Sequence, residues 1–437
     1  GLAQVQLRDV PDRAAFVAAV AAEVRRLAPG EWVVGGRWSV DSWDDPSPPR
    51  RDWIDAVTGD RPALLTRMDG HQALANTAAL KLAGIDANGP PDPKGGEIER
   101  DPVTREPTGI LKEAAIGLVG RFEPAVSTER RYEALRRAMA HFNRFGITSV
   151  HDMAPPEDLP VYARAAREGL LTLRVHVYVN VSDWTIHLDA VKRFKDPTGM
   201  VRVRGFKGFM DGSLGSRTAY MREPFADAAA AAVHPRGLLD AMADPVESFV
   251  KNQVEVIDAA GLQMAVHAIG DEANHLMLRA LETAQGHSGR RDARHRIEHA
   301  QHLLREDVAA FGRLGVVASM QPYHKADDGR YAGDALGEAR SAWSYAFRPV
   351  LESGGVLAFG SDWPVVTCDP FAGIAVAVTG RTLGKDGGLS GPVWMPQNSI
   401  TPAQALAAYT LGPAWAVHEE RDAGALAPGR RADFVVL

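Results

Sequence analysis

The sequence has one cysteine, no long apolar run and no concentration of basic residues. Cys368 cannot form a disulfide within the chain, which fits a reducing compartment such as the cytoplasm. No apolar run approaches the roughly 18 residues of a membrane-spanning helix, so no membrane association is expected. The formal net charge is −6 and the lysines and arginines are scattered, which argues against nucleic-acid binding. We expect a small-molecule substrate from this composition. A homo-oligomeric state is compatible with it.

Both ends of the sequence look incomplete. The chain opens on Gly1 rather than on methionine, and its last four residues form an apolar run typical of a strand. Residues 12–28 have apolar positions at helical spacing, with Asp12 placed to cap the helix. We interpret this helix as a crossover helix of a barrel whose first strand precedes Gly1.

Strand-like and helical segments alternate along the rest of the chain. The seven strand candidates that alternate with helices are residues 147–153, 173–181, 203–210, 263–269, 294–299, 316–321 and 356–361. Such alternation is typical of parallel βαβ units, and this many units in one core predict an α/β fold of the (β/α)8 barrel type. Residues 128–145 are expected to form a helix, and Thr401 opens another with a capping box and a proline at its first position.

The predicted barrel domain spans residues 1–423 and carries an insertion at residues 30–125. Within the insertion, residues 32–38 and 62–68 are predicted strands, and residues 73–82 have helical composition. Residues 84–109 are rich in glycine, proline and charge, so we expect a long loop there rather than a core element.

Ionisable residues lie at the ends of several predicted strands, where barrel enzymes place their catalytic groups. Lys207, Phe209 and Asp211 share one face of their strand because side chains alternate with a period of two. Lys207 in a barrel either forms a buried ion pair with Asp211 or another carboxylate, or is a desolvated amine. A desolvated, neutral amine can react with carbon dioxide and then supply an oxygen ligand to two metals.

Two histidines and an aspartate follow Lys207 along the strand ends. His267 and His299 would each, taken alone, more often be core residues than ligands, and parity places Glu298 opposite His299. Asp362 alone could be a helix cap or a turn residue. The order of lysine, histidine, histidine and aspartate on four strands favours one divalent-metal site, because such ions bind mixed nitrogen and oxygen ligands.

Five stretches of the sequence resemble amidohydrolase family 3 of the amidohydrolase superfamily, the group that includes N-substituted formamide deformylase. They are residues 67–80, 205–219, 266–271, 296–301 and 360–364. The resemblance runs along nearly the whole chain. It implies a barrel joined to a small β-sandwich from both termini, a divalent metal site and hydrolysis of a non-peptide C–N bond. Residues 424–437 resemble the family's return into that sandwich.

One departure from the family pattern concerns a His-x-His pair at the end of the first barrel strand. None of the 14 histidines is two residues from another. In relatives the pair lies just ahead of a stretch like Gly1-Leu2, so truncation is the expected explanation. If the pair is truly absent, a non-catalytic binding barrel becomes the alternative.

The ligand set predicts hydrolysis by an activated water. We expect one or two divalent ions, with zinc as the first choice, to lower the pKa of a bound water toward about 7. Asp362 is the predicted catalytic base that passes the proton to the leaving nitrogen. The same chemistry would serve an esterase or phosphoesterase, since fold does not fix substrate.

Further residues are predicted to bind substrate. His71 has two equal readings, a substrate or oxyanion contact and a helix-capping residue near Asn76. Gln321 and His324 follow a predicted strand and could line the pocket. Trp363 could line it too, although packing is as good an interpretation. The substrate-binding set is His71, Asp211, Gln321, His324 and Trp363.

Overall fold

The computed structural model describes residues 4–41, 43–45, 47–180, 184–227, 233–384 and 387–436. The chain forms two compact units. The first contains Gly1–Ala125, Gly212–Ala219 and Ala232–Ala241, and the second contains Val126–Asp211, Tyr220–Ala231 and Met242–Leu437. Two short segments between residues 211 and 242 therefore return to the first unit.

The first unit is built on a six-stranded sheet with the order β1-β2-β3-β4-β6-β5. Its first three strands are parallel to one another, and the other pairings are antiparallel. The strands are β1 (Val5–Gln6), β2 (Val33–Trp38), β3 (Ala63–Arg67), β4 (Gln72–Ala75), β5 (Gly96–Arg100) and β6 (Pro107–Glu113). The helices are α1 (Arg13–Arg26), α2 (Arg51–Thr58), α3 (Thr77–Leu82) and α4 (Ile116–Gly120).

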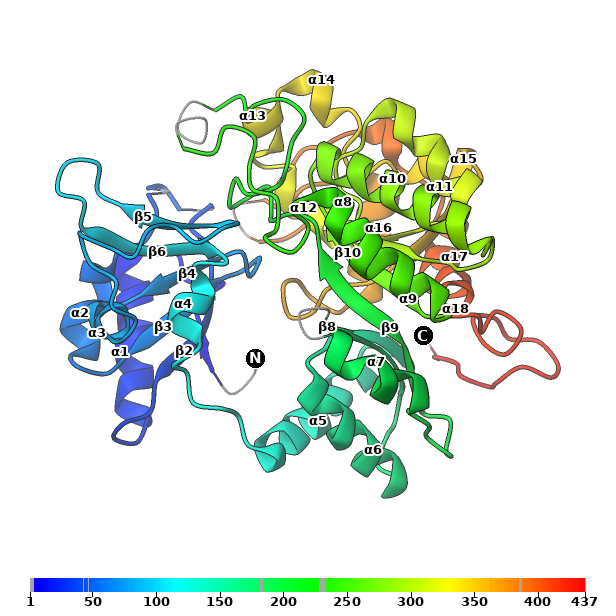
Figure 1. Ribbon diagram of the computed structural model, residues 1–437, viewed down its shortest axis with the longest axis horizontal. Helices are drawn as coiled ribbons and strands as arrows, with labels where there is room; N and C mark the ends of the chain where they lie inside the picture. Colours follow the sequence, from blue (N-terminus) through cyan, green and yellow to red (C-terminus); the bar gives the residue numbers. More distant parts are fainter. Residues whose placement is uncertain are drawn as a thin grey trace. The chain divides into compact units, whose positions relative to one another are not determined.

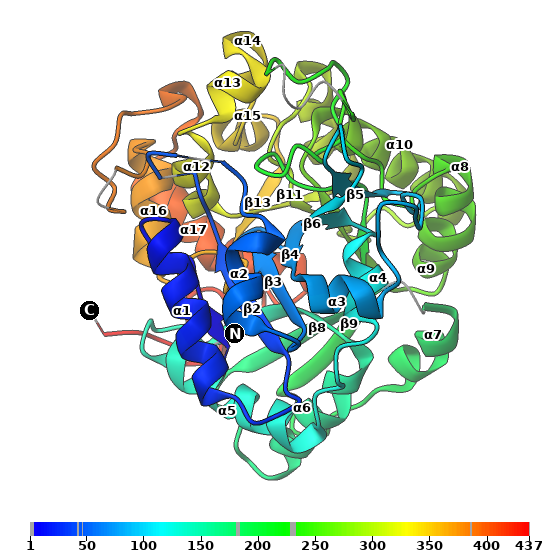
Figure 2. The same cartoon turned by 90° about the vertical axis from the view of Figure 1, so that its left-hand side faces the viewer.

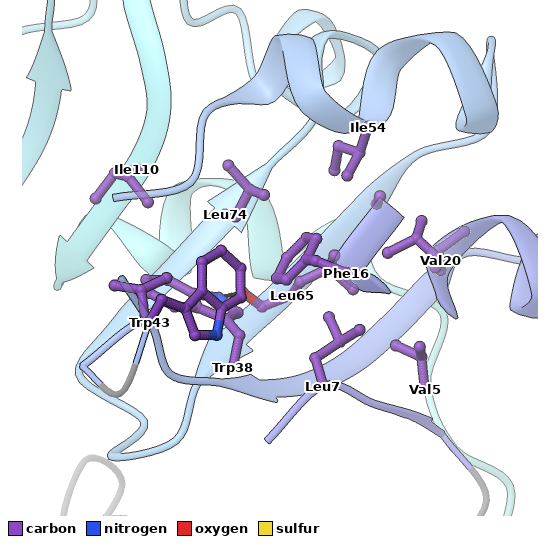
Figure 3. Packing of buried hydrophobic residues seen from close by; sticks show 13 residues of the cluster. Val5, Leu7, Phe16, Val20, Trp38, Trp43, Ile54, Leu65, Leu74 and Ile110 are labelled. Carbon is purple, nitrogen blue, oxygen red and sulfur yellow. Dashed lines mark hydrogen bonds between the residues drawn. The ribbon is translucent and has the colours of Figure 1, made fainter. Parts of the chain in front are cut away.

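Helices cover both faces of this sheet because neighbouring residues of a strand point to opposite faces. In β3, Leu65 packs in one core cluster with Phe16 of α1, whereas Leu64 packs in a second cluster with Leu80 of α3. Figure 3 shows Phe16 and Ile54, from α1 and α2, pointing toward the sheet residues of the first cluster.

Three expectations for this unit need correction. Helix α1, dark blue in Figure 2, does follow a strand, since β1 precedes it and pairs with β2 in the six-stranded sheet. It is therefore not a crossover helix of the seven-stranded sheet. Residues 72–75 form strand β4 rather than helix, because they pair with β3 and β6. Residues 96–113 contain the β5–β6 hairpin instead of a loop, and Ile98 is buried in the core.

The second unit contains a parallel seven-stranded sheet in which spatial order follows chain order. The strands are β7 (Ser149–Ala154), β8 (Arg174–Asn180), β9 (Val201–Phe209), β10 (Gln263–Ala268), β11 (Arg296–His299), β12 (Val317–Met320) and β13 (Val356–Phe359). Figure 1 labels β8, β9 and β10 of this sheet. Every residue of β10, β11 and β12 is buried. Burial along whole strands is typical of parallel sheets covered by helices.

Helices connect these strands. The π-helix Val250–Val254 joins α8 to α9. Thr401 and Gln404 form the predicted capping box at the start of α17. The helices are α5 (Thr128–Asn143), α6 (Leu159–Arg167), α7 (Trp184–Arg193), α8 (Val246–Phe249), α9 (Glu255–Ala259), α10 (Asp271–Ser288), α11 (Val308–Leu314), α12 (Pro322–Asp328), α13 (Ala332–Leu336), α14 (Glu338–Ser341), α15 (Phe347–Glu352), α16 (Pro370–Thr379), α17 (Pro402–Tyr409) and α18 (Leu411–Ala416).

All seven predicted strands of the alternating series are present, with ends that differ by up to two residues. The arrangement is an α/β fold with the strand order of a (β/α)8 barrel. Strands β7 and β13 form the two edges of the sheet among the described residues. An eighth strand stays a prediction. Residues 431–436 carry no strand, and Phe434 and Val436 are exposed, so the small β-sandwich stays a prediction as well.

Candidate metal centre

Three of the four predicted ligands lie on adjacent strands of the seven-stranded sheet, near the carboxyl-terminal ends of these strands. In the pairing of β9 with β10, Lys207 lies opposite Ala265, two residues before His267. In the pairing of β10 with β11, His299 lies opposite Ala268. The imidazole rings of His267 and His299 meet edge to face with their centroids 4.5 Å apart. The two histidines are therefore neighbours, as the sequence predicted.

His299 reaches this contact because its backbone leaves the regular strand conformation. In the strand register His267 lies opposite Glu298, so regular alternation would turn His299 to the other face. The φ angle of His299 is +77° and that of Ala300 is +44°. Left-handed backbone of this kind is uncommon outside glycine and is concentrated at functional sites.

Glu298 instead joins a buried polar network beneath the strand end. Its carboxylate accepts hydrogen bonds from Arg296 and from Ser319, each at 2.6 Å. The Nη1 atom of Arg296 lies 2.6 Å from Nδ1 of His151. Burial, together with the charge of Arg296, lowers the pKa of His151 well below its usual value, so its neutral ring can accept this hydrogen bond.

Gln321 orients the ring of His299. The Nε2 atom of Gln321 donates to the backbone oxygen of Ser319 at 3.2 Å, so its Oε1 atom is the one that lies 2.7 Å from Nδ1 of His299. Nδ1 must then carry the proton, which leaves the lone pair of Nε2 available for a metal. This geometry favours a positioning role for Gln321 over the predicted substrate contact.

Lys207 is buried at the end of β9. Its Nζ atom donates a hydrogen bond of 3.0 Å to the backbone oxygen of Gly208. The same atom lies 3.6 Å from the centroid of the Phe209 ring. The amine is therefore largely shielded from water.

Asp211 holds the ends of two strands together. Its carboxylate accepts hydrogen bonds from the backbone amides of Tyr220, Ile269 and Gly270 at 2.7–3.0 Å. One oxygen also lies 3.5 Å from Nε2 of His267. Because both oxygens bind backbone amides, this geometry favours positioning of His267 over the predicted contact with substrate.

Asp362 follows β13 and is exposed, with a left-handed φ of +54°. A carboxylate oxygen of Asp362, a ring nitrogen of His299 and a ring nitrogen of His324 all lie within 4.8 Å of one another. His324 lies in the first turn of α12 and is buried. Two imidazoles and a carboxylate are the donor set of catalytic zinc sites, so these residues fit a divalent cation.

The ring of Trp363 packs on helix α5. Its centroid lies 5.0 Å from that of Phe142 and 5.4 Å from that of His141. These contacts support the packing interpretation of Trp363 over a position in the substrate wall.

His71 belongs to the first unit and forms a cluster of its own. Its Nδ1 atom lies 2.9 Å from a carboxylate oxygen of Glu113. The cap of the nearby helix α3 is the side chain of Asn76, which accepts from the backbone amide of Ala79. The capping interpretation of His71 is therefore wrong, and the substrate contact stays a prediction.

Asp69 lies beside His71 in a buried polar network. It accepts hydrogen bonds from the hydroxyls of Ser213 at 2.6 Å and Ser216 at 2.8 Å, and it pairs with Arg67. Burial acts to raise the pKa of Asp69, but the charges of Arg67 and His71 and the two hydroxyls lower it to about 2. The carboxylate is therefore ionised at neutral pH.

The sequence interpretation missed several buried polar residues next to the centre. Lys325 donates a hydrogen bond of 3.1 Å to the backbone oxygen of Met395, and burial lowers its pKa to about 8. Asp328 accepts from Gln301 at 2.7 Å and from Tyr345 at 2.6 Å. The position of Lys325, directly after His324, was the one available signal. Gln301 and Tyr345 are separated from Asp328 by 27 and 17 residues, so no local motif joins them to it.

Comparison with known proteins places the chain in a family. The amidohydrolase family model matches residues 1–437. Protein LONG AFTER FAR-RED 3 of Arabidopsis thaliana is 36% identical over 451 residues, covering 100% of this chain and 74% of that protein. N-substituted formamide deformylase of Arthrobacter pascens is 27% identical over 444 residues, covering 94% of this chain and 75% of that protein.

A solved structure supports the same assignment. An uncharacterized metal-dependent hydrolase from Pyrococcus horikoshii OT3 has a TM-score of 0.75 and 26% identity, covering 100% of this chain and 82% of that one. The chain therefore belongs to amidohydrolase family 3, as the motifs predicted. Among the described residues, no helix combines the length and the apolar character needed to cross a membrane.

Proposed function

We propose that the chain hydrolyses a non-peptide C–N bond of a small amide-type substrate with the help of a divalent metal, zinc in the first instance. The observation that carries this proposal is the meeting of the His267 and His299 rings at the end of parallel strands, with Asp362 close to His299. The similarity to N-substituted formamide deformylase supports an amide-type substrate.

Lys207, His267, His299 and Asp362 are the residues we propose to hold the metal. A divalent cation bound there would lower the pKa of a water molecule and polarise the scissile carbonyl. The two buried histidines present their ring nitrogens from the ends of β10 and β11. Such preorganised ligands need little rearrangement on binding.

Asp362 is the proposed catalytic base and acid. It is the exposed member of the set, so both water and substrate can reach its carboxylate. An ionised carboxylate can take a proton from water and deliver it to the leaving nitrogen, which departs poorly unless it is protonated. Its left-handed backbone turns the residue at the strand end, where the chain would otherwise continue extended.

We further propose that Lys207 is carboxylated in the active protein. The Nζ atom would form a bond to the carbon of carbon dioxide and release one proton, which converts a buried amine into an anionic oxygen ligand. The burial of Lys207 favours the neutral amine that this reaction needs. Intact mass measurement under carbon dioxide would reveal the added group.

An experiment on Asp362 tests the catalytic proposal. Zinc-loaded protein is assayed on a panel of N-substituted formamides, with matched esters as competitors. Asp362→Asn is expected to lower kcat for the best amide by about 10²- to 10⁴-fold. Asp60→Asn, at an exposed position in the first unit, is the matched control and should keep full activity. Absence of amide hydrolysis by the zinc-loaded wild type would contradict the proposal.

A further inference from the structure

His324 lies close to two of the proposed metal ligands, His299 and Asp362. A ring nitrogen of His324, a ring nitrogen of His299 and a carboxylate oxygen of Asp362 are mutually within 4.8 Å. Zinc binds nitrogen and oxygen at about 2.0–2.2 Å, so its ligand atoms are separated by roughly 3–4 Å. Small side-chain adjustments would bring the three atoms around one ion.

We propose that His324 is a metal ligand, and that His299, His324 and Asp362 form a two-histidine, one-carboxylate site for a divalent cation. The proposal rests on the metal-dependent function above. It extends that function by giving His324 a ligand role in place of the substrate contact predicted from the sequence.

The orientation of the two rings supports this site. The His299 and His324 rings are nearly parallel, with an interplanar angle of 16° and centroids 5.9 Å apart. Because Gln321 binds Nδ1 of His299, the Nε2 atom is the one available to a metal. Both rings are buried.

The contrast in exposure gives the site an open side. His299 and His324 are buried, whereas Asp362 is exposed. Three protein ligands with access from solvent are typical of catalytic zinc sites, which keep one position for water or substrate. Structural zinc sites, in comparison, are closed by four protein ligands.

The proposed site shares His299 and Asp362 with the ligand set predicted from the sequence, and it has His324 in place of Lys207 and His267. Nε2 of His267 lies 3.5 Å from Asp211, and Nζ of Lys207 donates to Gly208. A site that uses His324 therefore predicts a response to mutation that the expected set of Lys207, His267, His299 and Asp362 does not.

Zinc titration of the metal-free protein tests the proposal. His324→Ala should weaken zinc binding by at least tenfold in a calorimetric titration. The control is His275→Ala, which removes a histidine that pairs with Asp307 on another helix and should change affinity by less than twofold. Zinc binding by His324→Ala that equals that of the wild type would overturn the proposal.

A second measurement does not depend on the folding of a variant. Crystals of the wild-type protein are soaked in zinc at a concentration that saturates the titration, and the anomalous difference map is calculated. The expected peak lies about 2.1 Å from a ring nitrogen of His324. A peak ligated without His324, or no peak, contradicts the proposal.

Amide hydrolysis measured on the same samples separates the two ideas. If zinc binds through His324 but no amide is cleaved, the ligand assignment stands and the proposed function fails. If amides are cleaved and zinc affinity is indifferent to His324, the function stands and the ligand assignment fails.

Discussion

The Nδ1 atom of His299 lies 2.7 Å from the Oε1 atom of Gln321, and this contact sets which ring nitrogen of His299 faces the metal centre. Gln321 is itself held by its hydrogen bond to the backbone of Ser319. Hydrogen bonds to metal-ligating histidines typically change metal affinity by 10- to 100-fold when removed. We therefore expect Gln321 to act as a positioning residue with a measurable effect on metal binding.

We expect Gln321→Leu to lower zinc affinity about 10- to 100-fold, because His299 loses the acceptor that orients it. The measurement is a zinc titration of the metal-free protein. Gln321→Glu keeps an acceptor at the same place and should bind within a few-fold of the wild type. Equal affinity in the leucine variant would show that the ring is oriented by other contacts.

Replacing Asp211 by asparagine should destabilise the second unit by about 1–3 kcal/mol. The amide nitrogen of asparagine cannot accept the backbone N–H groups that the carboxylate binds, so at least one buried donor loses its partner. Chemical denaturation followed by circular dichroism gives the change in unfolding free energy. Asp60→Asn, at an exposed site, serves as the control and should shift stability by less than about 0.5 kcal/mol.

Asp69 should give the protein a pH-dependent stability at acid pH. Its pKa falls from the ordinary value of 3.8 to about 2 on folding, so the folded state binds fewer protons than the unfolded state between these values. The resulting stabilisation, about 2 kcal/mol, is fully present above pH 5 and is lost as the pH falls toward 2. Between pH 5 and 2 the unfolding free energy should depend less steeply on pH for Asp69→Asn than for the wild type. The same pH dependence in both proteins would contradict the lowered pKa of Asp69.

Phe16→Ala should lower the free energy of unfolding of the first unit by about 3–5 kcal/mol, because it leaves a cavity in the core. The ring is fully buried and meets the rings of Trp43 and Trp53 edge to face at 6.3 and 6.1 Å. We expect faster hydrogen exchange in strands β2 and β3 of Phe16→Ala, with little change in β10. Val103→Ala, at a side chain that is 88% exposed, should leave exchange unchanged.

The seven parallel strands could be predicted because their signal is local. Most of them are short runs rich in apolar residues, as expected for strands that are buried on both faces. Strand β11 is the exception, because Ile297 is its one apolar residue. The β5–β6 hairpin could not be recognised in the same way. Residues 96–100 contain one apolar side chain, Ile98, among charged residues, and the strand forms because it pairs with β6 at the edge of the sheet.

The candidate site was predictable in its residue types but not in its geometry. The strand ends identified His267 and His299, whose rings are indeed in contact. The left-handed backbone at His299 could not be predicted, because such a conformation is expected from sequence mainly at glycine. For the same reason the sequence could not show that His324 approaches His299 and Asp362.

The hydrogen bonds of Asp69 to Ser213 and Ser216 have a consequence for the modularity of the protein. A fragment ending at residue 125 would retain the carboxylate and Arg67 but lose both hydroxyls, which belong to a segment of the chain more than 80 residues further on. A fragment defined by a single chain boundary after residue 125 therefore does not contain the whole first unit. Its evolutionary exchange between relatives would have to carry the segment that follows strand β9 along with it.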